Sequence, residues 1–157
     1  MTTIVHYRGQ IAYDSRVTAG NRIISDKTNK KRVVGGYTFW LSGCTSDWDN
    51  VIQAYLTGGK VISADVSAFC RKPDGTVVQL GLEEDGRVWE AVVERDDPEA
   101  IGSGSAHALT AVDCGCSVRD AVRMAIKRDS RSGGRIRVDT VSVSYTHLRA
   151  HETEADL

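Results

Sequence analysis

The sequence predicts an α+β protein in which helices cover antiparallel sheets. Three features support this fold class: strand patterns dominate the first part of the chain, one helical pattern interrupts them, and two more helical patterns lie close together before a last strand. Strands and helices that are segregated along a chain are typical of the α+β class. The 157 residues, of which 41% are hydrophobic and 26% charged, match the size and composition of one globular domain.

The N-terminal part of the chain is predicted to form two pairs of strands. Residues 3–8 and 11–14 are rich in β-forming residues and flank a two-residue turn, which predicts a hairpin. The short apolar run 22–24 and the longer strand pattern 32–41 follow it. Two glycines stand near the start of the longer pattern, which we expect to form one strand.

The first helix is predicted to begin shortly after the second pair of strands. Ser46 or Asp47 can cap a helix that runs to about Leu56, because their side-chain oxygens accept hydrogen bonds from first-turn N–H groups. The pair Gly58 and Gly59 is expected to end it. Its apolar face, at helical spacing, consists of Trp48, Val51, Ile52 and Tyr55.

An antiparallel meander is predicted next, from three strand patterns at 64–70, 76–80 and 87–93. The turn sequences Pro-Asp-Gly and Glu-Asp-Gly separate them. A run of glycine and serine at 101–105 then opens a helix over about 106–112. After the first helix, the next predicted helices therefore lie in the last third of the chain.

The C-terminal part is predicted to add one helix, one strand and a tail. Ser117 is a suitable N-cap for a helix that runs to about Arg128, and residues 135–143 predict the last strand. We assign residues 2–143 to one domain. Residues 144–157 show neither strand alternation nor a core-facing helical stripe and resemble peptide produced by read-through into adapter sequence, so we expect a non-native or disordered tail.

Charge, apolar runs and cysteine spacing argue against several partners and cofactors. The formal net charge of −1 argues against a dedicated nucleic-acid binder. The longest apolar stretches are too short and too interrupted by glycine to span a bilayer, so we expect a cytoplasmic protein with no membrane partner. The 4 cysteines form no CxxC pair and have no matching histidine pair, so we expect reduced, mostly buried thiols, no metal and no cofactor.

The first two residues offer an unusual nucleophile. Met1 precedes the small residue Thr2, so removal of Met1 would expose a threonine whose α-amine lies beside its own hydroxyl. An α-amine with a pKa of about 7.7–8.0 is partly neutral at neutral pH and can take the hydroxyl proton directly or through one water. Many chains begin with Met-Thr and make no use of it, so the residues that accompany Thr2 decide the interpretation.

Two charged residues are candidates for activating Thr2. A lysine favours the neutral amine by repulsion and stabilises an alkoxide by attraction, and Lys30 is the candidate for this role. Asp14 could anchor that lysine through a charge-assisted hydrogen bond. Each has an ordinary alternative: Lys30 stands in a basic run in which Lys31 is the competing assignment, and Asp14 stands at a strand end where aspartates often serve turns.

Several segments resemble, in order and spacing, the landmarks of proteasome β-type subunits and of the simpler bacterial ATP-dependent peptidase of the same family. They are Thr2-Thr3-Ile4-Val5, residues 11–18 with Gly20-Asn21, Lys30, residues 42–47, residues 101–105 and residues 129–134. The resemblance covers most of the chain from residue 2 to about residue 140. It implies a four-layer αββα sandwich of the N-terminal-nucleophile hydrolase class, in a compact bacterial or phage form with one outer helix truncated.

The resemblance also implies roles for individual residues. Thr2 corresponds to the nucleophile, Asp14 and Lys30 to its charged partners, and Gly43 to the glycine whose N–H helps to bind the oxyanion. Three residues correspond to those that hold the threonine amine and a nucleophilic water: Ser103, Asp129 and Ser132. The substrate pocket is implied near Lys30 and three further residues: Ala19, Leu41 and Thr45.

These correspondences imply a threonine-type endopeptidase that acts on peptides or unfolded proteins. The family forms homo-oligomeric rings that an ATP-dependent unfoldase supplies with substrate, and Trp48 and Tyr55 on the first helix are candidates for the ring contact. Two alternatives stay open: a small-molecule amidase on the same fold, and a catalytically silent assembly or virion-associated protein.

Overall fold

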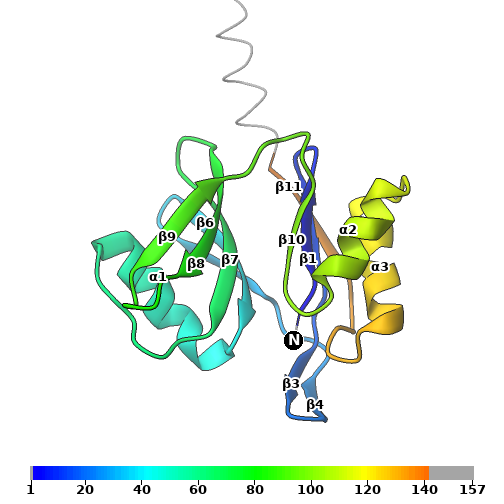
Figure 1. The fold of residues 1–157 in the computed structure, drawn as a ribbon, viewed down its shortest axis with the longest axis horizontal. Helices are drawn as coiled ribbons and strands as arrows, with labels where there is room; N and C mark the ends of the chain where they lie inside the picture. Colours follow the sequence, from blue (N-terminus) through cyan, green and yellow to red (C-terminus); the bar gives the residue numbers. More distant parts are fainter. Residues whose placement is uncertain (1, 142–157) are drawn as a thin grey trace, which may run out of the picture.

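The computed structural model describes residues 2–141 of the chain, and these form two stacked antiparallel sheets with helices on their outer faces (Figure 1). The strand order of the first sheet is β10 (Glu99–Ile101), β1 (Ile4–Tyr7), β2 (Gln10–Tyr13) and β11 (Arg137–Thr140). The strand order of the second sheet is β5 (Lys31–Val34), β6 (Tyr37–Gly43), β7 (Val66–Arg71), β8 (Val77–Leu82) and β9 (Val88–Val92). A small separate sheet pairs β3 (Val17–Ala19) with β4 (Arg22–Ser25). The predicted tail at 144–157 lies outside the described residues.

Three hydrophobic clusters define four layers. Helix α1 (Trp48–Thr57), which follows the short 3-10 helix η1 (Thr45–Asp47), packs on the outer face of the second sheet. A second cluster lies between the two sheets. A third joins the first sheet to α2 (Ser105–Asp113) and α3 (Val118–Arg128). The order helix, sheet, sheet, helices is visible in Figure 1, and the α+β fold class predicted from the sequence is confirmed.

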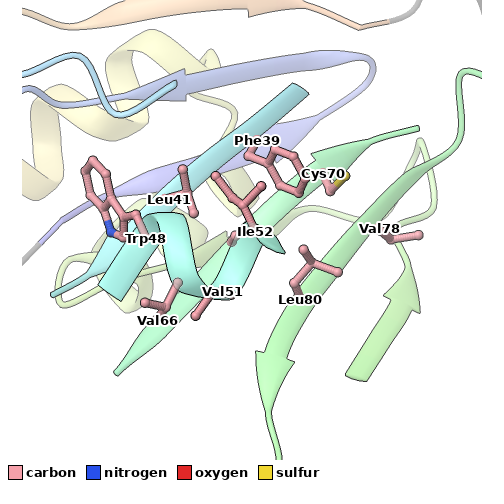
Figure 2. Close-up of a cluster of buried hydrophobic side chains, with 10 residues drawn as sticks. Phe39, Leu41, Trp48, Val51, Ile52, Val66, Cys70, Val78 and Leu80 are labelled. Atoms are coloured by element: carbon pink, nitrogen blue, oxygen red, sulfur yellow. The ribbon is translucent and has the colours of Figure 1, made fainter. Parts of the chain in front are cut away.

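The outer cluster of the second sheet explains why α1 forms where it does. Trp48, Val51 and Ile52 are each 2% exposed and pack against strand residues such as Phe39 and Leu41 (Figure 2). Full burial of a side chain of this size stabilises the fold by about 1.5–3 kcal/mol. The helical face predicted from spacing is therefore the face that packs. Because Trp48 is buried here, the expectation that it forms part of an exposed contact patch is wrong.

The cluster between the sheets follows from alternation along β6. Phe39 and Leu41 face α1, whereas Trp40 belongs to the inter-sheet cluster with residues of the first sheet such as Ile4 and Ile11. Successive strand residues point to opposite faces, so one strand contributes to both cores. This arrangement holds β1 and β2 firmly against the second sheet. It fixes the position of the residues at the ends of those strands.

Most predicted elements are present, with three differences. The pattern at 32–41 is the hairpin of β5 and β6 rather than one strand, because the chain turns at Gly35, whose φ is +59°. Strand β3 was not predicted, so the run 22–24 was expected to pair with the pattern at 32–41, whereas β4 pairs with β3 in a separate sheet. Strand β10 was not predicted either: it has 3 residues and pairs with β1, which is distant in sequence.

The capping signals are confirmed in part. Asp47 is the N-cap residue of α1, but its side chain makes no capping hydrogen bond and accepts from the Asp65 N–H instead. The Ser117 hydroxyl accepts a hydrogen bond from the Asp120 N–H at 3.2 Å, as expected of the N-cap of α3. Helix α1 ends at Gly58, which has φ of 76° in the left-handed region. Among residues 2–141, no helix is both long enough and apolar enough to cross a membrane.

Candidate active site

The N-terminal segment brings Thr2 next to a buried lysine. The Lys30 Nζ donates a hydrogen bond to Thr2 Oγ1 at 2.9 Å and another to Asp14 Oδ1 at 2.8 Å. All three residues are buried, with Thr2 only 1% exposed. Thr2 lies two residues before β1, Asp14 directly follows β2, and Lys30 directly precedes β5. The site therefore lies where the ends of three strands from both sheets meet.

Asp14 is a fully engaged carboxylate. Its Oδ1 accepts from Lys30 and from the Thr3 N–H at 3.2 Å. Its Oδ2 accepts from the Gly133 N–H at 2.9 Å and from the Arg16 N–H at 3.3 Å. A buried carboxylate that accepts several N–H bonds is held in one orientation. It can therefore fix the position of the Lys30 ammonium.

The protonation of Lys30 reflects two opposing effects. Burial lowers the pKa of the Lys30 ammonium, because a charged group loses its hydration, while the nearby Asp14 carboxylate raises it. Burial is the larger effect, so the pKa lies below the ordinary value. A lysine of this kind remains cationic beside its carboxylate and gives up a proton more readily than a surface lysine.

A second hydrogen-bonded cluster lies on the backbone side of Thr2. The Thr2 N–H donates to Ser103 Oγ at 3.1 Å, and Ser103 Oγ in turn donates to Asp129 Oδ2 at 2.6 Å. Ser132 Oγ donates to the same Asp129 oxygen at 2.7 Å. Burial raises the pKa of Asp129, but the hydrogen bonds from Ser103, Ser132 and the Arg131 N–H together bring it below its ordinary value. A charged carboxylate therefore lies one serine away from the Thr2 nitrogen.

Two glycines allow this close approach. A Cβ on Gly102 would overlap the Thr2 carbonyl oxygen, and a Cβ on Gly104 would overlap Thr3 Oγ1. Gly102 also has φ of +96°, which favours glycine. The sequence Gly-Ser-Gly therefore lets Ser103 reach Thr2 while its two neighbours leave room for the N-terminal backbone.

A cavity of about 320 Å³ opens beside Thr2 and Lys30. Gly43, at the end of β6, lies in its wall. Gly43 has φ of +93°, and a Cβ there would overlap the carbonyl oxygen of Asp65, so the position requires glycine. Beside Thr2, Lys30 and Gly43, the cavity is lined by Val17, Thr18, Ala19, Gly20, Cys44, Thr45 and Trp48.

The predicted substrate-pocket residues are placed differently from one another. Ala19 and Thr45 line the cavity, whereas Leu41 does not. Leu41 has no exposed surface and belongs to the cluster beneath α1, so its assignment to the pocket is corrected. The reason is position along β6: Leu41 lies beneath α1 together with Phe39, and the chain reaches the cavity only where the strand ends, at Gly43.

The structure also brings to the site residues of the family-like segments to which the sequence assigned no role. Thr3 Oγ1 lies 2.7 Å from Ser132 Oγ, and Gly133 and Arg16 donate backbone hydrogen bonds to Asp14. The hairpin of β1 and β2 was a usable signal for Thr3, since it places Thr3 beside Asp14. No local pattern indicates that Gly133, more than a hundred positions later, reaches the same carboxylate.

The 4 cysteines differ in their exposure. Only Cys70 is buried, Cys44 and Cys116 are partly exposed and Cys114 is exposed, so the expectation of mostly buried thiols is wrong. Burial raises the pKa of the Cys70 thiol to about 12. Within residues 2–141, no group of three or more His, Cys, Asp or Glu side chains is arranged to hold a metal ion.

Comparisons with known proteins relate the chain through its fold. No protein-family model matches the sequence, and no curated protein matches it. The structure of eukaryotic HslV from Trypanosoma brucei superposes with a TM-score of 0.67 and 19% identity, covering 88% of this chain and 98% of HslV.

Two structures of BPH from Thiobacillus denitrificans give a similar result. BPH in complex with epoxomicin superposes with a TM-score of 0.61 and 17% identity, and the structure titled BPH alone with 0.58 and 19%. In both cases the match covers 90% of this chain and 98% of BPH. The chain therefore has the fold of proteasome-like N-terminal-nucleophile hydrolases, as the resemblance predicted.

Proposed function

We propose that this chain is a threonine-type peptidase, which cleaves peptide bonds by acyl transfer to Thr2 after removal of Met1. The observation that carries the proposal is the hydrogen bond of 2.9 Å from Lys30 Nζ to Thr2 Oγ1, made by a buried lysine that is also paired with Asp14. Burial of a lysine costs stability even when a carboxylate pairs with it. An ammonium that is held in place at this cost and also contacts a hydroxyl favours a catalytic role over a structural one.

Removal of Met1 is the first requirement. While Met1 is attached, the Thr2 nitrogen is an amide and cannot accept a proton. Once Met1 is removed, the amine takes the proton of the Thr2 hydroxyl, and Oγ1 attacks the carbonyl carbon of the scissile bond. Lys30 stabilises the negative charge that develops on Oγ1 and disfavours the protonated amine.

The tetrahedral intermediate carries its negative charge on the former carbonyl oxygen. We assign the Gly43 N–H as a donor to that oxygen, supported by the position of Gly43 in the wall of the same cavity. One such donor contributes about 2.7–4 kcal/mol to transition-state stabilisation. As the C–N bond breaks, the leaving amine takes the proton held by the Thr2 amine, and an ester on Thr2 remains.

Hydrolysis of the ester completes the cycle. The Thr2 amine takes a proton from a water, the hydroxide adds to the ester carbon, and the C–O bond breaks to release the acid and restore the threonine hydroxyl. Ser103, Asp129 and Ser132 hold the amine and the water. The hydrogen bond between the Thr2 nitrogen and Ser103 Oγ at 3.1 Å supports this assignment.

Peptides are the substrates that the cavity favours. Its volume of about 320 Å³ accommodates one large side chain, and its walls combine apolar groups from Val17, Ala19 and Trp48 with backbone at Gly20 and Gly43. An extended peptide can place one side chain in such a cavity while its main chain lies across the opening. The apolar lining favours an uncharged side chain next to the cleaved bond.

Assembly into a homo-oligomeric ring is the second part of the proposal. A nucleophile open to solvent would act on any peptide that reached it, and a closed ring restricts access. An ATP-dependent unfoldase would then supply unfolded substrate. Sedimentation velocity at micromolar concentration tests this part: a sharp species of about six or more subunits supports a ring, and a monomer with full peptidase activity contradicts it.

The decisive test of the mechanism is intact-mass analysis after treatment with an epoxyketone. The threonine hydroxyl adds to the ketone, and the free amine opens the epoxide, so nothing leaves and the mass rises by that of the whole probe. We expect loss of Met1 and one added probe in the parent chain, and none in Thr2→Ala. An unlabelled but folded parent chain would contradict the proposal. Labelling without peptide hydrolysis but with hydrolysis of small amides would favour an amidase.

A further inference from the structure

A second cavity of about 320 Å³, separate from the one beside Thr2, lies where β11, the start of β5 and the start of α3 meet. Four cationic side chains line it: Lys31, Arg119, Arg135 and Arg137. They come from three parts of the chain, so the sequence does not show them as a cluster. The formal net charge of −1 for the whole chain hides this local excess of positive charge.

Asp139 is the one acidic side chain in the lining, and it is already engaged. Its Oδ2 accepts hydrogen bonds from the Tyr13 hydroxyl at 2.8 Å and from Trp40 Nε1 at 2.9 Å, and lies 3.4 Å from Lys31 Nζ. Four cations and one carboxylate leave a formal charge of +3 around the cavity. Asp139 therefore neutralises at most Lys31.

The three arginines have no counter-charge in the described part of the chain. Among residues 2–141, no ion pair joins Arg119, Arg135 or Arg137 to a carboxylate. The ion pairs found there are made by other arginines and lysines. The Nε of Arg137 is buried without a hydrogen-bond partner among the same residues. A buried guanidinium N–H without an acceptor destabilises the fold, and an oxyanion in the cavity would supply that acceptor.

We propose that this cavity binds a multiply charged phosphoanion of the diphosphate or triphosphate class. Guanidinium groups bind phosphate oxygens through paired N–H donors, and a charge of +3 is matched by several phosphate charges rather than by one carboxylate. The apolar contribution to the lining is limited to Ile136 and Val138, beside the ring of Tyr13. The site therefore favours a ligand without an apolar body.

Isothermal titration of the full chain with sodium triphosphate tests the proposal. We expect one triphosphate to bind per chain, with an affinity that weakens as sodium chloride is added because salt screens the charges. Arg119→Gln and Arg137→Gln should each weaken binding about ten-fold or more, since each removes a charge-assisted hydrogen bond. The matched control is Arg87→Gln, an exposed arginine already paired with Asp85, which should bind like the parent chain.

Thermal unfolding with and without triphosphate gives a second readout that does not depend on heat of binding. A ligand of the folded state raises the melting temperature, and the rise should be lost in Arg119→Gln, whose side chain is on an exposed helical position and should not be needed for folding. No binding by the parent chain would overturn the proposal. So would an equal loss in Arg87→Gln, or equal competition by acetate. None of these measurements uses peptidase activity, so their failure leaves the proposed function unaffected.

Discussion

Lys30 Nζ lies 2.8 Å from Asp14 Oδ1, and neither residue has any exposed surface. The next residue along the chain, Lys31, directs its ammonium to Asp139 at 3.4 Å and remains partly exposed. Two consecutive lysines therefore have different surroundings, because successive residues at a strand point in opposite directions. This difference provides a matched pair of variants.

Lys30→Ala should lower kcat for a fluorogenic peptide by about 100-fold or more, because it removes a fixed positive charge from Thr2 Oγ1. Lys31→Ala should change kcat by less than about two-fold, since the expected effect of an exposed ion pair is small. Steady-state kinetics on the two variants, with circular dichroism to check folding, decides between them. The reverse order of effects would show that the site is assigned one residue too early.

Asp14→Asn should lower the free energy of unfolding by about 3–5 kcal/mol, because it leaves the buried Lys30 ammonium without its counter-charge. Adding Lys30→Met to that variant should recover part of the loss, since the unpaired charge is then absent. Urea denaturation of the parent chain, both single variants and the double variant forms the required cycle. Additive losses would argue against a coupled pair.

An exposed pair serves as the control for this cycle. Asp85 and Arg87 lie 2.8 Å apart, with side chains that are 44% and 63% exposed. Asp85→Asn should leave the free energy of unfolding nearly unchanged, because solvent screens the attraction. A loss as large as that of Asp14→Asn would mean that burial is not what makes the Lys30 pair important.

Gly43→Ala should both destabilise the chain and abolish activity. The added Cβ would overlap the Asp65 carbonyl oxygen, and the φ of +93° is strained for any other residue, so we expect a loss of several kcal/mol. Gly20→Ala is the matched control: Gly20 also lines the cavity and has φ of +58°, but a Cβ there meets nothing within 4 Å. It should cost only about 1 kcal/mol. Equal losses would show that backbone conformation alone, rather than contact with Asp65, makes Gly43 necessary.

Local patterns predicted the elements whose stability is local. The hairpin of β1 and β2, the three-strand meander and the three helices were all visible as periodicity bounded by turn or cap residues. Strand β10 was not, because its 3 residues become a strand only by pairing with β1. Gly35 was noticed but not interpreted as a turn, since a glycine inside an apolar run also fits a continuous strand.

The candidate site was harder to predict than the fold. The chemistry of Thr2 suggested a nearby lysine, but the choice of Lys30 came from the resemblance to a family rather than from spacing. Leu41 was assigned to the pocket because the sequence does not show that α1 covers this part of β6 and leaves only its end, at Gly43, beside the cavity. Contacts such as Gly133 with Asp14 depend on tertiary packing, which no local pattern encodes.

His6 provides a prediction about pH that does not involve catalysis. It lies in β1, is 2% exposed, and its Nδ1 is buried with no hydrogen-bond partner among the described residues. Burial lowers the pKa of His6, and the positive charge of Arg95 lowers it further, to about 4 from an ordinary value of 6.5. The folded chain therefore holds His6 in its neutral form under conditions where the unfolded chain protonates it.

The sign of the effect follows from proton binding. Between pH 6.5 and about 4, the unfolded chain binds a proton at His6 that the folded chain does not, so stability falls as the pH is lowered through this range. The full loss is about 3 kcal/mol. In urea titrations, His6→Gln should lose less stability than the parent chain between about pH 7 and pH 4.5, whereas the surface control His107→Gln should not differ from the parent. Identical pH profiles for the parent chain and His6→Gln would show that protonation of His6 does not limit stability in this range.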